Sequence, residues 1–322
     1  MKTVGIIGGA GFIGSHITKR FLEAGFKVKV SSTDVSNRSK YEHLLDFDNA
    51  GNLEIVPLDL RESETVKGFA EGCNIIVHTG TPFQFEMQDA QTELFEPTVK
   101  GTKELLEVAR NAENLEKIIF VASVASWNTS FPMMPEGYAS DHIFSEIDQP
   151  FYSENDIPYA RAKYLADQSV RKFTSENRDL EFEIVTVSPV FVIGSALSNK
   201  REASSLTLLH LIKNKVTDDA FVGGLFAADP PISMVDVRDV AEAVFQSATK
   251  TNLHGKNYLL ANESYKVSDI SLMLNHQSPV SEAIYTYSNA LAKNDLGIDF
   301  IRAGETLNSY SDKQEPFTAT VR

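Results

Sequence analysis

Gly8-Gly9-Ala10-Gly11-Phe12-Ile13-Gly14, close to the amino terminus, is the stretch that decides the fold. It ends an apolar run at residues 3–8, which predicts a buried strand, and it precedes an amphipathic segment at 15–24, which predicts a helix. Glycines at positions 8, 11 and 14 carry no side chains, so the backbone can turn sharply and approach a pyrophosphate at the helix amino terminus. The stretch therefore predicts a dinucleotide-binding turn.

Similar strand-like runs recur along the chain and alternate with helical patterns. The apolar runs lie at residues 3–8, 27–31, 53–57, 75–78, 117–122 and 182–187. Helical patterns lie at 15–24, 93–111 and 160–177. Alternation with near-continuous Val/Ile strands predicts an α/β fold, a Rossmann-type doubly wound parallel sheet with helices on both faces.

Two irregular stretches, 127–158 and 195–231, interrupt this alternation. The first is a long loop with scattered aromatic residues, which is typical of a binding loop. We expect a dinucleotide-binding domain of residues 1–188 and 232–262. Residues 189–231 and 263–322 are expected to form a smaller, carboxyl-terminal substrate-binding lobe.

The composition excludes several classes of function. The 322 residues include 30 Lys+Arg and 44 Asp+Glu, a formal net charge of −14, which disfavours binding to nucleic acid or to an anionic membrane. A single cysteine excludes a disulfide framework and Cys-rich metal sites, and no His/Asp/Glu cluster has metal-ligand spacing. No apolar run is long enough to span a bilayer. We expect a cytoplasmic monomer or homodimer that acts on a small molecule and binds no metal.

The end of the second predicted strand bears on the choice of dinucleotide. By count from Gly14, the position beside the adenosine ribose is Ser32, and a hydroxyl there tolerates a 2′-phosphate. Arg38 and Lys40 could bind such a phosphate, which favours NADP. Asp34 is the alternative, because a shift of one or two residues would put its carboxylate on the ribose of NAD. The two basic residues could also be simple solvated charges.

A Tyr-x-x-x-Lys spacing and a strand-end serine form the candidate catalytic group. One helical turn places Tyr159 and Lys163 on the same helix face, where the ammonium can stabilise a phenolate. Ser123 follows the strand predicted at 117–122, at the carboxyl edge of the sheet where ligands bind. Ser126 is the alternative hydroxyl. His78 is expected to be a packed, hydrogen-bonded core residue.

These motifs together resemble the extended short-chain dehydrogenase/reductases of the NAD-dependent epimerase/dehydratase superfamily, and in pattern the dihydroflavonol, cinnamoyl-CoA and aldehyde reductase group. Segments at 77–83, 96–102, 188–194 and 234–240 extend the resemblance over about residues 1–262. It implies a catalytic Ser123, Tyr159 and Lys163. The implied cofactor contacts are Gly8, Gly11, Phe12, Ile13, Gly14, Ser32, Arg38, Asp59, Leu60, Thr79, Gly80, Thr81, Tyr159, Lys163, Pro189 and Val192.

The resemblance also implies a reaction. Tyr159 would protonate a carbonyl oxygen held by Ser123, while Lys163 binds the cofactor ribose and lowers the pKa of Tyr159. A fairly bulky, apolar aldehyde or ketone is expected, because the loop and the lobe supply apolar side chains: Phe83, Met133, Met134, Phe151, Phe191 and Phe226.

Two alternatives remain open. One is a nucleotide-sugar epimerase or dehydratase, although Val124-Ala125 stands where dehydratases carry an Asp-Glu pair. The other is a non-catalytic dinucleotide-sensing protein, which typically loses the Tyr or the Lys that this chain keeps. Asp239 is expected to cap a helix or to make a structural hydrogen bond rather than to catalyse.

Overall fold

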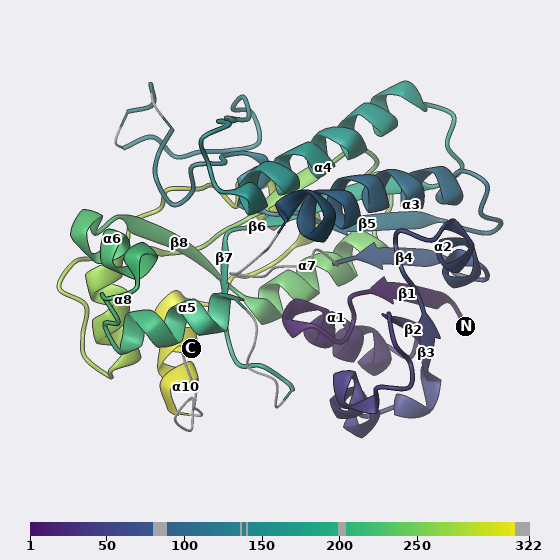
Figure 1. Ribbon diagram of the computed structural model, residues 1–322, viewed down its shortest axis with the longest axis horizontal. Coiled ribbons are helices and arrows are strands. Elements are labelled where there is room, and N and C mark those ends of the chain that lie inside the picture. The colour runs from purple at the N-terminus through teal and green to yellow at the C-terminus, as the bar shows by residue number, and fades with distance from the viewer. Residues whose placement is uncertain (80–88, 136, 140, 199–203, 313–322) are drawn as a thin grey trace.

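A parallel sheet of seven strands forms the centre of the molecule (Figure 1). The computed structural model describes residues 1–79, 89–135, 137–139, 141–198 and 204–312. The strand order is β3-β2-β1-β4-β5-β6-β9, and every neighbouring pair is parallel. The strands are β1 (Thr3–Ile7), β2 (Lys27–Ser32), β3 (Leu53–Pro57), β4 (Ile75–His78), β5 (Lys117–Val121), β6 (Glu183–Pro189) and β9 (Asn257–Leu260). The predicted doubly wound α/β fold is confirmed.

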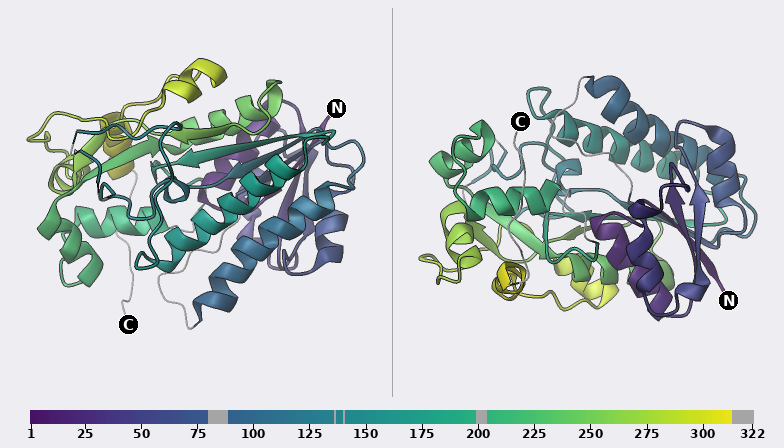
Figure 2. Two further views of the ribbon diagram at one scale, coloured as in Figure 1. Left: turned by 90° about the horizontal axis from the view of Figure 1, so that it is seen from above. Right: turned by 60° about the horizontal axis from the view of Figure 1, so that its bottom comes forward.

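Helices cover both faces of this sheet because side chains of a strand alternate between its faces. On one face, α1 (Phe12–Glu23) and α7 (Val237–Thr249) pack against Val4, Ile6 and Val77. On the other face lie α2 (Ser63–Ala70), α3 (Gly101–Ala109) and α4 (Pro158–Glu176). The two views of Figure 2 show the same layers.

The helix predicted at 93–111 is built in two parts. A π-helical segment, η4 (Gln91–Lys100), continues into α3. Pro97 lies inside η4 and has no backbone N–H to donate, which is a physical reason for the wider helical turn. Four short 3₁₀ helices complete this part of the fold: η1 (Arg38–Lys40), η2 (Glu42–Asp46), η3 (Ala50–Asn52) and η5 (Val124–Ser126).

A second, three-stranded sheet in the order β10-β8-β7 lies beside the main one. It consists of β7 (Phe191–Ile193), β8 (Pro231–Asp236) and β10 (Ser264–Lys266). Around it are α5 (Ser204–Lys213), α6 (Ala220–Ala228), α8 (Val267–Leu274) and α10 (Ala303–Asp312), while α9 (Ala290–Leu296) packs near β9. Residues 232–262 were expected in the dinucleotide-binding domain. Of these, β8 pairs instead with β7 and β10 of the expected lobe, whereas α7 and β9 belong to the layers of the main sheet. The division into two domains stays a prediction.

Candidate active site

The glycine turn between β1 and α1 has the geometry that its sequence predicts. Gly8 has φ +79°, a conformation that side chains disfavour, and its N–H donates to Ser31 Oγ at 2.9 Å. A Cβ on Gly14 would lie 2.0 Å from the Gly8 carbonyl oxygen. Gly11 precedes Phe12 and Ile13, the first residues of α1, and no side chain caps that helix. The first N–H groups of α1 are therefore available to an anion such as a pyrophosphate.

A cavity of about 630 Å³ extends from this turn along the carboxyl edge of the sheet. Its walls come from the ends of β1, β2 and β3 and from η4. They are Ile7, Gly8, Ala10, Gly11, Ser31, Ser32, Thr33, Lys40, Tyr41, Leu58, Asp59, Leu60, Arg61, Thr92, Glu93 and Pro97. Five of the predicted cofactor contacts, Gly8, Gly11, Ser32, Asp59 and Leu60, thus line one cavity.

The polar end of this cavity lies beside Ser32. Lys40 lines it and donates from Nζ to Thr33 Oγ1 at 3.2 Å. Arg38 is exposed in η1 and does not line this cavity, so its predicted contact stays a prediction. Asp34 is exposed as well, and its carboxylate accepts hydrogen bonds from the Ser36 hydroxyl at 2.6 Å and the Ser36 N–H at 3.0 Å. These hydrogen bonds lower the pKa of Asp34.

Sequence reasoning missed two residues at this end. Arg61 forms a bidentate pair with Asp59, with Nη2 2.6 Å from Oδ2, and Tyr41 lies in the same wall. Asp59 and Leu60 after the third strand could have pointed to Arg61, whereas Tyr41 had no signal. Ser31, which braces Gly8, was also not foreseen because the partners are 23 residues apart.

Three further predicted cofactor contacts, Thr79, Pro189 and Val192, do not line this cavity. Thr79 hydrogen-bonds through Oγ1 and N–H to the Ile7 carbonyl at 2.8 and 3.0 Å. Pro189 ends β6, and Val192 lies in β7. Gly80 and Thr81, like Phe83 of the expected substrate pocket, lie outside the described residues.

Ser123, Tyr159 and Lys163 converge where β5 ends and α4 begins. Ser123 has extended backbone and accepts the Ala125 N–H on Oγ at 3.2 Å. The Tyr159 side chain hydrogen-bonds the Ser123 side chain. Lys163, one turn further, is 7 % exposed and donates from Nζ to the Val121 carbonyl at 3.4 Å. The structure therefore brings the predicted Ser-Tyr-Lys group together.

Burial sets the protonation of this group. Burial raises the pKa of Tyr159 to about 12, although the hydrogen bond from Ser123 lowers this pKa in part. Burial lowers the pKa of Lys163 to about 8, although the negative charge of the nearby Asp167 carboxylate raises this pKa in part. At neutral pH the phenol keeps its proton and the amine is mostly charged. A protonated phenol beside a cation can act as a general acid.

The other candidate side chains have structural surroundings. Ser126 is fully buried, and its hydroxyl donates to the Ser123 carbonyl at 2.5 Å. His78 is buried and packs on Phe120 at a ring distance of 5.7 Å, and its pKa falls to about 3 through burial and the Lys163 charge. The hydrogen bond expected at His78 is not made by Nε2, which has no partner among the described residues.

Of the two structural roles expected for Asp239, the structure shows the hydrogen bond and not the helix cap. Asp236 caps α7, because its carboxylate accepts the Arg238 N–H at 2.7 Å. Asp239 lies within the first turn of that helix and accepts the Ile301 N–H at 2.9 Å. It therefore joins α7 to the carboxyl-terminal segment.

Several aromatic residues of the 127–158 loop pack into the protein interior. Phe144 is fully buried and packs on Tyr287 at 5.7 Å, and Phe131 packs on Tyr287 at 5.8 Å. Trp127 is buried beneath Arg171, whose guanidinium carbon lies 4.3 Å from the ring centre. Met133, in contrast, is 42 % exposed. Phe131, Phe144 and Trp127 therefore anchor the loop to the core, whereas Met133, one of the side chains expected around a substrate, is exposed.

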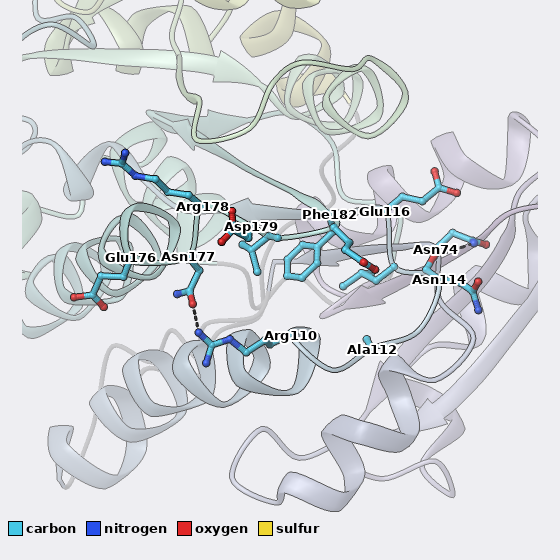
Figure 3. A pocket seen from close by; sticks show the side chains of 13 residues that line it. Asn74, Arg110, Ala112, Asn114, Glu116, Glu176, Asn177, Arg178, Asp179 and Phe182 are labelled. Atoms are coloured by element: carbon cyan, nitrogen blue, oxygen red, sulfur yellow. Dashed lines mark hydrogen bonds between the residues drawn. The ribbon is translucent and has the colours of Figure 1, made fainter.

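A second large cavity, of about 660 Å³, lies at the opposite edge of the sheet (Figure 3). It is bordered by Glu116 before β5 and Phe182 before β6, at the amino ends of the strands. Arg110 and Asn177, which follow α3 and α4, hydrogen-bond each other across it. Because ligands of open parallel sheets bind beyond the carboxyl ends, we do not assign the active site here.

The described residues also bear on two other classes of protein. In this part of the chain, no group of three or more His, Cys, Asp or Glu residues is arranged to hold a metal ion. No helix within the same residues is both long and apolar enough to cross a bilayer.

The fold and the site define a dinucleotide-binding α/β protein, and comparison with known proteins identifies its family. The model of the NAD-dependent epimerase/dehydratase family matches residues 4–261, so the chain belongs to that family. Cinnamoyl-CoA reductase CAD2 of Medicago truncatula is 26% identical over 332 residues, 97% of each chain. Anthocyanidin reductase of Arabidopsis thaliana is 25% identical over 297 residues, 90% of this chain and 85% of the relative.

Solved structures show the same fold. Yeast methylglyoxal/isovaleraldehyde reductase Gre2, complexed with NADPH, superposes with a TM-score of 0.79 at 24% identity, covering 95% of this chain and 96% of its own. Vestitone reductase from alfalfa has a TM-score of 0.71 at 21% identity and 97% coverage of both chains. The resemblance to extended short-chain dehydrogenase/reductases is confirmed, as is the predicted class, an NAD(P)-dependent oxidoreductase.

Proposed function

We propose that the protein is an NADPH-dependent reductase that converts the carbonyl of a fairly bulky, apolar aldehyde or ketone into an alcohol. The observation that carries this proposal is the Tyr159 phenol, hydrogen-bonded to Ser123 and one helical turn from the buried Lys163. These groups lie at the carboxyl edge of the sheet, at the same edge as the glycine turn.

A nicotinamide dinucleotide bound along this edge would supply the hydride for the carbonyl carbon. The chain itself supplies the proton and the positioning. Ser123 donates a hydrogen bond to the carbonyl oxygen, and Tyr159 transfers its phenolic proton to that oxygen as negative charge develops on it. Lys163 stabilises the resulting phenolate and binds ribose hydroxyls. Burial keeps Tyr159 protonated at neutral pH, which is the form that reduction needs.

Five features of the chain support NADPH as the cofactor. The glycine turn and the uncapped start of α1 fit a pyrophosphate. Ser32 leaves room for a 2′-phosphate, and Lys40 in the same cavity wall offers a cation to it. Asp34, the group that would favour NAD, is exposed and already held by Ser36. Cytoplasmic location and a monomeric or dimeric state stay predictions.

The reductase relatives guide the substrate panel. Gre2 is named for methylglyoxal and isovaleraldehyde, and the plant relatives for cinnamoyl-CoA and anthocyanidins. We expect the purified protein to oxidise NADPH with at least one member of a panel of aldehydes, ketones, flavanonols and acyl-CoA thioesters.

Two additions to the panel separate the alternatives. UDP- and GDP-sugars are included, with product analysis by mass spectrometry, to detect an epimerase or dehydratase. Conversion of a nucleotide sugar without net NADPH oxidation would replace the proposal with that activity. Tight NADPH binding without turnover of any compound would favour the dinucleotide-sensing alternative.

A further inference from the structure

A buried carboxylate lies directly behind the predicted catalytic lysine. Asp167 follows Lys163 by one turn of α4, on the same helix face, and is only 3 % exposed. Its Oδ2 accepts a hydrogen bond from Arg171 Nε at 2.6 Å, and its Oδ1 accepts one from Asn257 Nδ2 at 3.1 Å. Burial raises the pKa of Asp167, but donors on both oxygens favour the carboxylate. Burying a charge costs free energy, and its hydrogen-bond partners offset that cost only in part.

A network of buried polar contacts joins this carboxylate to the serine loop. Asn257 on β9 accepts the Ser188 hydroxyl at 2.8 Å, and Ser188 lies 3.3 Å from the Ser126 hydroxyl. Ser126 in turn donates to the carbonyl of Ser123 at 2.5 Å. The network therefore connects both sides of the proposed active site, the Ser123 loop and the helix that carries Tyr159 and Lys163.

Lys163 and Asp167 also share a small internal cavity of about 30 Å³. They do not approach within the 4.0 Å of a direct ion pair in the described structure. Two further buried atoms of the cavity residues, His78 Nε2 and Thr98 Oγ1, have no hydrogen-bond partner among the described residues. A cavity of this size with several polar groups suits an ordered water molecule, which could bridge the ammonium and the carboxylate.

We infer that Asp167 is a positioning residue for the proposed reduction: acting across this cavity, it holds Lys163 in its charged form and directed toward Tyr159. The inference rests on the proposed function, in which the charge of Lys163 stabilises the phenolate. In this role Asp167 does not touch substrate or cofactor.

Among the described charged and titratable groups around Lys163, Asp167 is the one that carries a negative charge. On α4 they are Tyr159, Asp167 and Arg171, and on β4 the group is His78, which burial keeps neutral. The cavity residues from η4, α3 and β5, such as Thr98, Thr102 and Val121, do not titrate, nor does Asn257 on β9. Asp167 is therefore the one carboxylate among the cavity residues that the structure describes.

The test is Asp167→Asn, read first on the protein without cofactor. Lysine labelled with ¹³C at the ε-carbon is titrated by NMR, and the Lys163 signal is assigned by its loss in Lys163→Met. We expect the Lys163 titration to move to lower pH by about 1 unit in Asp167→Asn, because the stabilising opposite charge is gone. Asp167→Glu should keep it near the wild-type pH. An unchanged Lys163 titration in folded Asp167→Asn would overturn the inference.

A matched control is Asp239→Asn, which removes a buried carboxyl from α7 rather than from α4. It should leave the Lys163 titration unchanged, and an equal shift there would mean that the effect is not specific to Asp167. In carbonyl reduction, the alkaline limb of the pH profile of kcat should shift to lower pH together with the Lys163 titration. This shift should occur in Asp167→Asn and not in Asp239→Asn. A purely structural role would lower kcat without moving that limb.

A charge-conserving exchange keeps the inference testable if Asp167→Asn fails to fold. Asp167→Asn combined with Asn257→Asp preserves an amide-carboxylate pair but moves the charge to a residue that does not line the cavity. The Lys163 titration should again move to lower pH, and no movement would contradict the inference. The NMR titration needs no turnover, so the Lys163 shifts can be measured even if the protein reduces no carbonyl. A failure to reduce any carbonyl would count against the proposed function alone.

Discussion

The two edges of the main sheet carry cavities of similar size, about 630 Å³ at the carboxyl edge and about 660 Å³ at the amino edge. Their chemistry differs. At the carboxyl edge the amino-terminal ends of α1 and α4 meet a glycine turn and the Ser123, Tyr159 and Lys163 side chains. At the amino edge α3 and α4 end, and exposed residues such as Arg110 and Glu116 line the cavity.

This difference follows from the connectivity of a parallel sheet. Each helix returns the chain from the carboxyl edge to the amino edge, so helix amino termini, with unpaired N–H groups, gather at the former and helix carboxyl termini at the latter. Anionic cofactors are therefore favoured at one edge only. Cavity volume does not distinguish the two edges, but the groups in their walls do, and the following predictions test that distinction.

The largest effect is expected from Tyr159→Phe, which tests whether the chemistry lies at the carboxyl edge. The substitution removes one hydroxyl with little change in shape, so folding and NADPH binding should survive. General acid catalysis contributes about 10²–10⁴-fold, so kcat on an accepted carbonyl should fall by that order. Steady-state kinetics measure it, with NADPH affinity from fluorescence as the control for binding.

The neighbouring variants separate the roles within this group. Lys163→Met should weaken NADPH binding as well as turnover, whereas Ser123→Ala should mainly slow the chemical step. Near-full turnover by Tyr159→Phe would show that another group donates the proton. In that case Ser126, His78 or a bound water would be the next groups to test.

The next effect in size concerns the polar end of the carboxyl-edge cavity. Lys40→Ala should weaken NADPH binding by about 10- to 150-fold, the loss of one charge-assisted contact of about 1.5–3 kcal/mol, and leave NADH binding nearly unchanged. Isothermal titration with both cofactors measures this. The same titration of Arg38→Ala decides between the two basic residues, because only Lys40 lines the cavity. NADH preferred by the wild type, with both variants silent, would assign the ribose contact to Asp34 and the cofactor to NAD.

Local sequence patterns were sufficient to predict six of the seven strands of the main sheet, all but β9, and the three side chains that meet where β5 ends and α4 begins. Every strand predicted in the first 190 residues forms within two residues of its expected bounds, because long Val/Ile runs bounded by turns have few alternative structures. Ser123, Tyr159 and Lys163 were recognisable because the end of a strand and the start of a helix place these side chains close together.

The features that were missed depend on contacts between residues far apart in the chain. Ser31 supports Gly8, and Asn257 reaches Asp167 over 90 residues, neither of which leaves a local pattern. The packing of Phe144 on Tyr287 was also not foreseen, because the two residues lie far apart in the chain. The membership of β8 in the small sheet likewise depends on pairing with β7 and β10.

A smaller effect, on stability rather than on catalysis, is expected from a buried carboxyl outside both compared cavities. Burial raises the pKa of Asp239 to about 7, so the folded state binds this proton more tightly than the unfolded state. The stability that the carboxyl contributes is therefore greatest below pH about 4 and is lost as pH rises toward 7. Asp239→Asn stays neutral throughout.

Asp239→Asn should consequently raise the free energy of unfolding at pH 8 by about 1–3 kcal/mol relative to wild type, with little difference at pH 4. Urea unfolding at the two pH values measures the gap. An equal effect at both values would mean that ionisation of Asp239 is not the cause. Turnover per folded molecule should stay the same, which separates stability from the active site.

The smallest effect is expected at the amino edge, where Arg110→Ala and Glu116→Gln test the cavity of Figure 3. Glu116 pairs with Lys2 at 2.5 Å, but both side chains are about half exposed, and such pairs contribute about 0–1 kcal/mol to stability. Arg110 is exposed and its hydrogen bond to Asn177 is a surface contact. NADPH affinity and kcat should therefore stay within about twofold of wild type, because neither residue lies at the edge where helix amino termini attract an anion. A tenfold loss in either quantity, with folding intact, would mean that the amino-edge cavity takes part in function and that the direction of the helices is not what separates the two edges.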